Sequence, residues 1–282
     1  MLKKNEYSDK ASTLTEAIPY FLKFRGKTFV FKIGGKILDS DEVFESIAED
    51  IVILSLVGIN PVVVHGGGKD ITAFLERLGI KSEFKDGIRK TDDKVMEIVE
   101  MVLDGKINGK IVSSICKKGG KAIGLSGRDS FCIISEKVEG RVGKVKKVKG
   151  EVIEKIIQSG FIPVFSPVTT TEDGISLNTN ADEVACEVAI SISSEKLILL
   201  TDEEGVIGKN NQILKTITKE EAEELIKEGI IHGGMIPKVR LAIKAIENGV
   251  KKVHIISGLI QHSVLLEIFT DQGIGTEIVA QT

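Results

Sequence analysis

The sequence predicts an α/β fold with a mainly parallel central sheet and helices on both of its faces. Runs of β-branched and aromatic residues at 27–33, 61–65 and 195–201 are typical of buried strands. Segments with helical spacing of apolar residues follow the first two runs, at about 41–54 and 71–78. Strands that are apolar throughout and alternate with helices indicate parallel pairing, because the crossover helices cover both faces of such a sheet.

The remaining periodicity continues this alternation along the chain. In order, it predicts a helix at 13–24, a hairpin at 83–90, a helix from 91, short strands at 119–150, a helix at 151–158, strands at 160–167 and 175–180, helices from 181 and at 219–228, a helix from 239, a strand at 252–257 and a helix at 262–269. The glycine turns follow the strands, so we expect the ligand at the carboxyl ends of the strands.

Composition indicates an ordinary globular protein. The 282 residues are 42% hydrophobic and 28% charged, and a formal net charge of −3 favours neither nucleic acid nor an anionic membrane as a partner. The three cysteines, Cys116, Cys132 and Cys186, form no C-x-x-C pair, and the four histidines have no zinc-site spacing. The N-terminus lacks the apolar region of a signal peptide. We expect a cytoplasmic protein, with the interior of an organelle such as a plastid as the alternative.

The segment before the first strand predicts a kinked helix. Thr13 and Glu16 have the spacing of a capping box, and Pro19 lies inside the helical pattern. Its apolar stripe has two possible partners, which are the rest of its own chain and a second copy.

Strand–glycine–helix junctions predict a phosphate site. The first strand ends at Lys32-Ile33-Gly34-Gly35 and the second at His65-Gly66-Gly67-Gly68. Such turns direct backbone N–H groups at an anion, and Lys32 adds a positive charge. Lys238 follows another glycine pair, Gly233-Gly234, near a helix start. Neither G-x-x-x-x-G-K-[ST] nor G-x-G-x-x-G occurs, so these are not the familiar nucleotide-binding loops.

Polar side chains near other junctions complete the candidate site. Asn178, Asn180 and Asp182 lie where a strand passes into a helix, and Arg89 follows a tight turn that allows bidentate binding of a carboxylate. Each residue also has a structural interpretation: helix caps for the first group, solvated charges for Arg89 and the lysines, and a packed, hydrogen-bonded side chain for His65. The occurrence of all these features in one chain favours the functional interpretation.

Two lysines without an obvious general base fit one reaction in particular. A carboxylate nucleophile has a pKa of about 4, so it is already ionised at neutral pH. Phosphoryl transfer to it needs positioning and charge neutralisation, with no proton to remove. Asp182 can fix both ammonium groups, and Mg²⁺ can be carried on the nucleotide phosphates with few protein ligands.

Taken in order, six segments resemble the amino acid kinase family. They are KTFVFKIGGK (27–36), PVVVHGGGKD (61–70), DGIRKTD (86–92), SLNTNADEVACEVA (176–189), KLILLTDEEGV (196–206) and HGGMIPKV (232–239). The resemblance implies a three-layer α/β/α sandwich. It divides the chain into an oligomerisation helix (1–25), a lobe for an acylated amino acid (26–170) and a lobe for ATP (171–282). Within the family, the sequence is most similar to members that phosphorylate the side-chain carboxylate of N-acetyl-L-glutamate in arginine biosynthesis.

The resemblance also implies a role for each candidate residue. Lys32 and Lys238 would stabilise the transferring phosphoryl group, and Asp182 would orient both lysines. Gly34, Gly35 and Gly66 would bind phosphate oxygens, and Gly67, Gly68, Arg89 and Asn178 would hold N-acetyl-L-glutamate. ATP and Mg²⁺ are the implied cofactors, and no metal site built from protein side chains is expected.

Both ends of the chain resemble those of family members that arginine inhibits. The kinked helix implies a hexamer arranged as a trimer of dimers. Residues 262–276 are similar to an arginine-binding tail, with His262, Glu267 and Gly273 as candidate contacts. Two alternatives stay open: a relative that acts on glutamate or aminoadipate, and a non-catalytic arginine sensor with the same fold.

Overall fold

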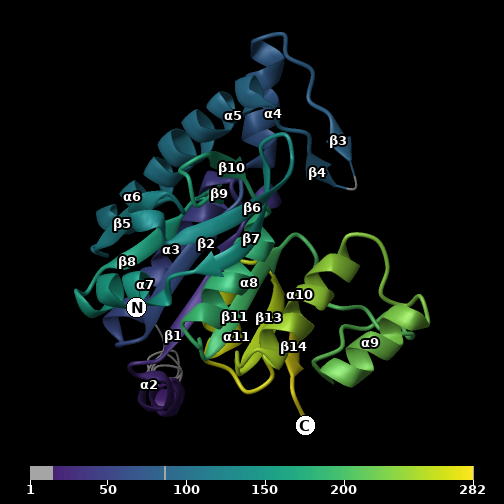
Figure 1. The fold of residues 1–282 in the computed structure, drawn as a ribbon. Coiled ribbons are helices and arrows are strands. Elements are labelled where there is room, and N and C mark those ends of the chain that lie inside the picture. The colour runs from purple at the N-terminus through teal and green to yellow at the C-terminus, as the bar shows by residue number, and fades with distance from the viewer. Residues whose placement is uncertain (1–14, 86, 282) are drawn as a thin grey trace.

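An eight-stranded sheet runs through the computed structural model, which describes residues 15–85 and 87–281 (Figure 1). The strand order is β12-β14-β13-β11-β1-β2-β8-β5, and β12 and β14 run opposite to the other six. The strands are β1 (Thr28–Ile33), β2 (Asn60–His65), β5 (Ala122–Leu125), β8 (Ile162–Phe165), β11 (Lys196–Thr201), β12 (Thr216–Thr218), β13 (Lys252–Ser257) and β14 (Thr276–Val279). The predicted α/β fold with a mainly parallel sheet is confirmed.

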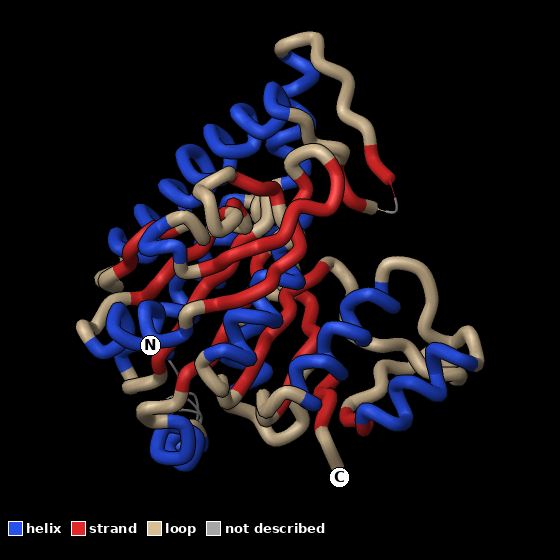
Figure 2. The backbone as a smooth tube through the Cα atoms, viewed as in Figure 1, coloured by secondary structure: helices blue, strands red, loops and turns tan. Residues whose placement is uncertain are grey.

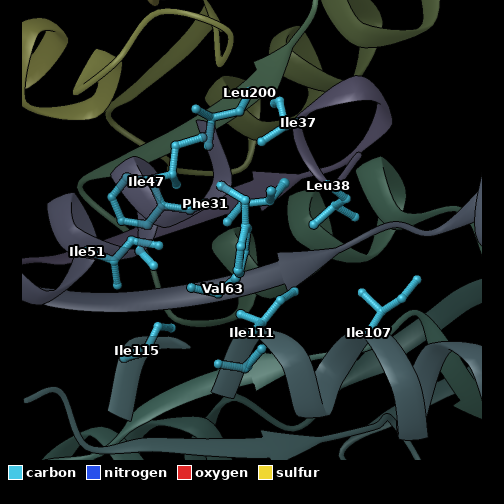
Figure 3. Close-up of a cluster of buried hydrophobic side chains, with 14 of the residues drawn as sticks. Phe31, Ile37, Leu38, Ile47, Ile51, Val63, Ile107, Ile111, Ile115 and Leu200 are labelled. Carbon is cyan, nitrogen blue, oxygen red and sulfur yellow. The ribbon is translucent and has the colours of Figure 1, made fainter. Parts of the chain in front are cut away.

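Helices cover both faces of this sheet (Figure 2). One face packs against α3 (Asp41–Leu56), α6 (Asn108–Lys117) and α11 (Ser263–Ile268), and the other against α7 (Gly150–Gln158), α8 (Ala181–Ser191) and α10 (Met235–Glu247). Because strand side chains alternate, Phe29 and Phe31 of β1 enter the first core, whereas Val30 enters the second. Figure 3 shows Phe31 in the first core beside Ile47, Ile51 and Val63.

Shorter strands lie outside the main sheet. β6 (Ile133–Glu139), β7 (Val142–Val148), β9 (Val168–Thr170) and β10 (Ser176–Asn178) form a small closed sheet. β3 (Phe84–Lys85) and β4 (Ile88–Arg89) pair as the antiparallel hairpin that the sequence predicts. The predicted short strands between 119 and 150 correspond to β5, β6 and β7.

The remaining helices include one type that the sequence did not predict. They are α2 (Ile18–Phe24), η1 (Gly35–Ile37), α4 (Gly68–Arg77), α5 (Asp93–Glu100), η2 (Met101–Ile107), η3 (Asp129–Phe131) and α9 (Lys219–Lys227). The helix expected from residue 91 begins at Asp93, because the Asp92 side chain accepts from the N–H of Val95 and caps it. It then passes through η2, a π-helix, into α6.

The N-terminal helix differs in detail from the prediction. Helical conformation is interrupted at Ala17, and Pro19 lies in the first turn of α2, where a proline is tolerated, instead of kinking a longer helix. Thr13 of the predicted capping box lies outside the described residues. The Phe21 ring packs edge-on against Phe269 of the same chain, at 4.9 Å between centroids, while Leu22 is 72% exposed. Within 15–85 and 87–281, no helix is both long and apolar enough to cross a membrane.

Candidate active site

Three elements bring Lys32, Asp182 and Lys238 together. Lys32 is next to last in β1, and alternation places it on the same face of the sheet as Val30, where α8 and α10 pack. Asp182 lies in the first turn of α8, and Lys238 lies near the start of α10. Asn180 is the N-cap of α8, with its side chain accepting from the N–H of Asp182 at 2.8 Å and of Glu183 at 3.3 Å. Asn180 therefore serves as a helix cap, which was its structural interpretation.

The Asp182 carboxylate lies between the two ammonium groups. Its Oδ1 is 2.9 Å from Lys32 Nζ, and its Oδ2 is 3.4 Å from Lys238 Nζ. Only 14% of the Asp182 side chain is exposed. Burial by itself raises the pKa of Asp182, but the charges and hydrogen bonds of Lys32 and Lys238 outweigh it and hold that pKa below its ordinary value. Asp182 is therefore ionised at neutral pH and pairs with both lysines.

The two glycine turns meet beneath Lys32. A Cβ added at Gly34 would lie 2.7 Å from Lys32 Nζ, so any larger residue there would displace the ammonium group. A Cβ at Gly66 would lie 3.7 Å from the Cα of Gly34, which shows how closely the turns approach. The N–H of Gly66 donates to the Ile33 carbonyl at 2.7 Å and is engaged in this conformation. The phosphate-binding roles of Gly34, Gly35 and Gly66 stay predictions.

A cavity of about 210 Å³ opens beside Lys32 and Asp182. Its lining includes all four residues predicted to hold the acyl amino acid: Gly67, Gly68, Arg89 and Asn178. The Asn178 side chain donates to Thr91 Oγ1 at 3.1 Å, which fixes the orientation of its amide. These four residues come from three separate segments of the chain, and the structure brings them together in one cavity.

Arg89 is a buried cation without an acidic partner. It is 5% exposed, and burial lowers the pKa of its guanidinium. It donates to the Gly68 carbonyl at 2.7 Å, to Thr72 Oγ1 at 2.9 Å and to Ser82, and it lies 4.6 Å from the centre of the Phe84 ring. Among the described residues, no carboxylate lies within ion-pair distance of it. A buried guanidinium whose hydrogen-bond partners are all neutral is well suited to bind an anionic group.

Sequence reasoning did not identify the neighbours of Arg89. Thr72 and Ser82 lie on α4 and in the segment after it, and they reach Arg89 only because the β3–β4 hairpin folds back. Neither residue belongs to a motif that the sequence singled out. The hairpin turn at residues 86–87 was the only signal in the sequence that pointed to this contact.

A second cavity, of about 320 Å³, lies beside Lys238. It is lined by Thr201, Asp202, Glu203, Gly205, Ile207, Ile230, Ile231, His232, Gly233, Gly234, Met235 and Lys238. Asp202 also forms a 3.0 Å ion pair with Lys36, which follows the first glycine turn. The two cavities share the sheet edge, with Lys32 lining one and Lys238 the other. No group of three or more His, Cys, Asp or Glu forms a candidate metal site in the described part of the chain.

His65 is a packed histidine, as its structural interpretation proposed. It is completely buried, and burial lowers its pKa to about 4, so the ring is neutral at pH 7. It hydrogen-bonds Gly66 and Asn108 and does not line either cavity.

The candidate arginine contacts do not all lie together. Glu267 accepts from the N–H groups of Ile274 and Gly275 at 2.6 and 3.0 Å, and a Cβ at Gly273 would lie 2.7 Å from its Oε2. His262 instead contacts Asp50 of α3, at 2.7 Å from Nδ1 to Oδ1. The histidine beside Glu267 is His254, at 2.6 Å, which the sequence reasoning missed because it lies inside β13.

We predict that Asp182→Asn lowers the free energy of unfolding at pH 7 and that this deficit shrinks on acidification. The folded-state pKa of Asp182 lies below its ordinary value of 3.8. The ionised group therefore stabilises the fold above that ordinary value, and this contribution is lost as pH falls through the folded-state pKa. Urea unfolding from pH 7 to about pH 3 measures both proteins, with the exposed Glu154→Gln as a control. A deficit that is equal at both ends of the range contradicts the prediction.

Comparison with known proteins identifies the family. The model of the amino acid kinase family matches residues 27–257. The acetylglutamate kinase of Aquifex aeolicus (strain VF5) is 47% identical over 98% of this chain and 100% of its own length. That of Kosmotoga olearia is 49% identical over 96% of this chain and 97% of its own.

Solved structures agree on the fold. The N-acetylglutamate synthase of Neisseria gonorrhoeae, complexed with coenzyme A and N-acetyl-glutamate, superposes with a TM-score of 0.85 at 25% identity. The match covers 96% of this chain and 64% of the synthase chain, so this chain spans less than two thirds of that protein. Carbamate kinase from Giardia lamblia bound to AMP-PNP has a TM-score of 0.66 at 19% identity, over 90% and 98% of the two chains. By sequence and by fold, this chain belongs to the amino acid kinase family.

Proposed function

We propose that this protein transfers the terminal phosphoryl group of ATP to the side-chain carboxylate of N-acetyl-L-glutamate. The product is N-acetyl-L-glutamyl 5-phosphate, an intermediate of arginine biosynthesis. The observation that carries the proposal is the Asp182 carboxylate paired with both Lys32, which lines one cavity, and Lys238, which lines the other. Full-length relatives named acetylglutamate kinase at 46–49% identity support the choice of substrate.

The chemistry needs positioned positive charge and no general base. A carboxylate acceptor is ionised at neutral pH, so it attacks phosphorus without losing a proton. Lys32 and Lys238 neutralise the negative charge that spreads over the transferring phosphoryl oxygens. Asp182 keeps both ammonium groups directed at that point and remains ionised itself.

The smaller cavity is the proposed site of the acyl amino acid. Arg89 binds one carboxylate of N-acetyl-L-glutamate, because a buried guanidinium without an acidic partner gains most from an anion. The N–H groups of Gly67 and Gly68 and the amide of Asn178 complete the contacts. Phe84 stacks on Arg89 from the exposed β3–β4 hairpin, so the hairpin limits access to the bound substrate.

The larger cavity is the proposed nucleotide site. It extends from Lys238 along the carboxyl end of β11, where open α/β sheets bind ligands. The phosphates would reach Gly34 and Gly35, and ATP would enter as its Mg²⁺ complex. The Asp182 carboxylate is already paired with two lysines, so Mg²⁺ would be held mainly by phosphate oxygens and water.

The division into lobes and the oligomeric state are also proposals. Residues 26–170 contribute most of the acyl amino acid site and residues 171–282 the nucleotide site, with β1 and β11 paired between them. Residues 1–25 would join dimers into a hexamer. Support comes from α2, which packs Phe21 on its own chain yet leaves Leu22 exposed. A cytoplasmic location remains our expectation.

We predict that ATP consumption with Mg²⁺ requires N-acetyl-L-glutamate and that hydroxylamine traps the acyl phosphate formed. L-Glutamate tests the need for the acetyl group, and aminoadipate, which has one methylene more than L-glutamate, tests the chain length by comparison with L-glutamate. Turnover of either acid in place of N-acetyl-L-glutamate would move the protein to a sister group with the same mechanism. Folded protein that turns over none of them would contradict the kinase proposal.

We predict that arginine at millimolar concentration inhibits the enzyme and that Glu267→Gln weakens this inhibition. A guanidinium binds a carboxylate by charge-assisted hydrogen bonds, so the arginine concentration for half inhibition should rise about tenfold or more. Glu247→Gln, the same change on α10 away from the Glu267 cluster, serves as the control. Full activity of the wild-type enzyme at these arginine concentrations would contradict the proposal.

A further inference from the structure

At the ends of β1 and β2, Lys32 and His65 point to opposite faces of the sheet. The register of β1 and β2 pairs Lys32 with Val64 and Ile33 with His65. Val64 belongs to the core under α8, whereas Val63 belongs to the core under α3 and α6. Alternation therefore places His65 on the α6 face, opposite Lys32. His65 thus lies behind the glycine loop that the proposed substrate contacts from the front.

The contacts of His65 define its tautomer. Asn108 Nδ2 donates to the Val164 carbonyl at 2.9 Å and lies 3.2 Å from His65 Nε2. An amide nitrogen only donates, so His65 Nε2 accepts and the ring proton is on Nδ1. Nδ1 lies 2.9 Å from the Gly66 carbonyl, which only accepts. Asn108, His65 and Gly66 therefore form one directed chain of hydrogen bonds.

This chain of hydrogen bonds orients the peptide group between Gly66 and Gly67. In a trans peptide the C=O and N–H bonds point in opposite directions. A Gly66 carbonyl held towards His65 therefore turns the N–H of Gly67 towards the opposite side, where Lys32 and the substrate cavity lie. Within the described residues, nothing accepts a hydrogen bond from that N–H. It remains available to a ligand.

The π-helix η2 supports the loop from the same side. A Cβ at Gly67 would lie 2.2 Å from Ile107 Cδ1 and 2.6 Å from Leu103 Cδ2, so these side chains hold the loop closely. Asn108 follows η2 directly, and a Cβ at Gly124 would lie 2.0 Å from its Oδ1. Gly124 thus makes room for the Asn108 amide. A π-helix within an otherwise α-helical segment is often found at functional sites.

We infer that His65 and Asn108 are positioning residues that hold the Gly66–Gly67 peptide with its N–H directed into the acceptor cavity. The inference rests on the proposed phosphoryl transfer, in which that N–H stabilises an oxygen of the acceptor or of the transferring group. Neither side chain touches the substrate. Both act through the loop, and His65 serves as a neutral relay and not as an acid or base.

Kinetics of four variants test the inference. His65→Leu and Asn108→Ala each interrupt the chain of hydrogen bonds, whereas His65→Asn keeps a hydrogen-bond donor near the position of Nδ1. Ser114→Ala removes another buried hydrogen bond of α6, to Glu45, that does not reach the loop. We expect the first two to lower kcat about 10–100-fold, which is less than the roughly 100–1,000-fold loss on removal of a transition-state donor, because the N–H of Gly67 is misdirected and not removed. The affinity for a non-hydrolysable ATP analogue should stay within about twofold, His65→Asn should recover most of kcat, and Ser114→Ala should match the wild type.

Two results would overturn the inference. One is a kcat within about twofold of the wild type in both His65→Leu and Asn108→Ala. The other is an equal loss of kcat in Ser114→Ala, which would indicate a general effect of destabilising α6.

A spectroscopic measurement separates this inference from the proposed function. Nitrogen NMR of histidine-labelled wild-type protein, with the His65 signal identified by its loss in His65→Asn, reports the tautomer without any turnover. We expect the neutral form with its proton on Nδ1 at pH 7. A proton on Nε2, or a charged ring, would overturn the inference even in an active enzyme. If the wild type forms no acyl phosphate, the proposed function fails, and the tautomer still decides the hydrogen-bond chain.

Discussion

The site depends on one carboxylate that holds two ammonium groups. The ammonium groups of Lys32 and Lys238 pair with the same carboxylate and, as like charges close together, repel each other. Lys238 also lies near the N-terminus of α10, the end of a helix that disfavours a positive charge. Asp182, at the N-terminus of α8 with Asn180 as its cap, offsets both penalties. The arrangement concentrates positive charge on a protein whose formal net charge is −3.

Strand alternation then decides what each face of the sheet contributes. Lys32 emerges on the face of α8 and α10, where Asp182 and Lys238 can reach it. His65, one position further along the paired register, emerges on the face of α6 and meets Asn108. The glycines between them allow the two turns to approach each other closely, since a Cβ added at Gly66 would lie 3.7 Å from the Cα of Gly34. A shift of one residue in β2 would exchange these faces.

The sequence predicted the sheet and most members of the site for a simple physical reason. Short apolar strands, glycine turns and helix starts are local signals, and parallel strands bring their carboxyl ends to one edge. That rule accounts for Lys32 near the end of β1, and the helix start accounts for Asp182 in the first turn of α8. Arg89 lies on the β3–β4 hairpin and Asn178 ends β10 of the small closed sheet, so parallel pairing does not explain their positions. All four residues line one cavity. The π-helix η2 was missed because a π-turn displaces the helical pattern by one residue, which short apolar spacing does not reveal. The partners of Arg89 and the pairing of His262 with Asp50 depend on tertiary contacts, which no local pattern encodes.

The rate of the chemical step in Lys238→Met tests the central claim most directly. Lys244→Met, two turns along α10 and paired with Glu187, is the matched control. Single-turnover measurements with saturating ATP and N-acetyl-L-glutamate separate this step from binding and product release. If Lys238 stabilises the transferring phosphoryl group, the step slows about 100-fold or more while affinity for an ATP analogue changes little and the control keeps the wild-type rate. A Lys238→Met rate within about threefold of the wild type would contradict the account.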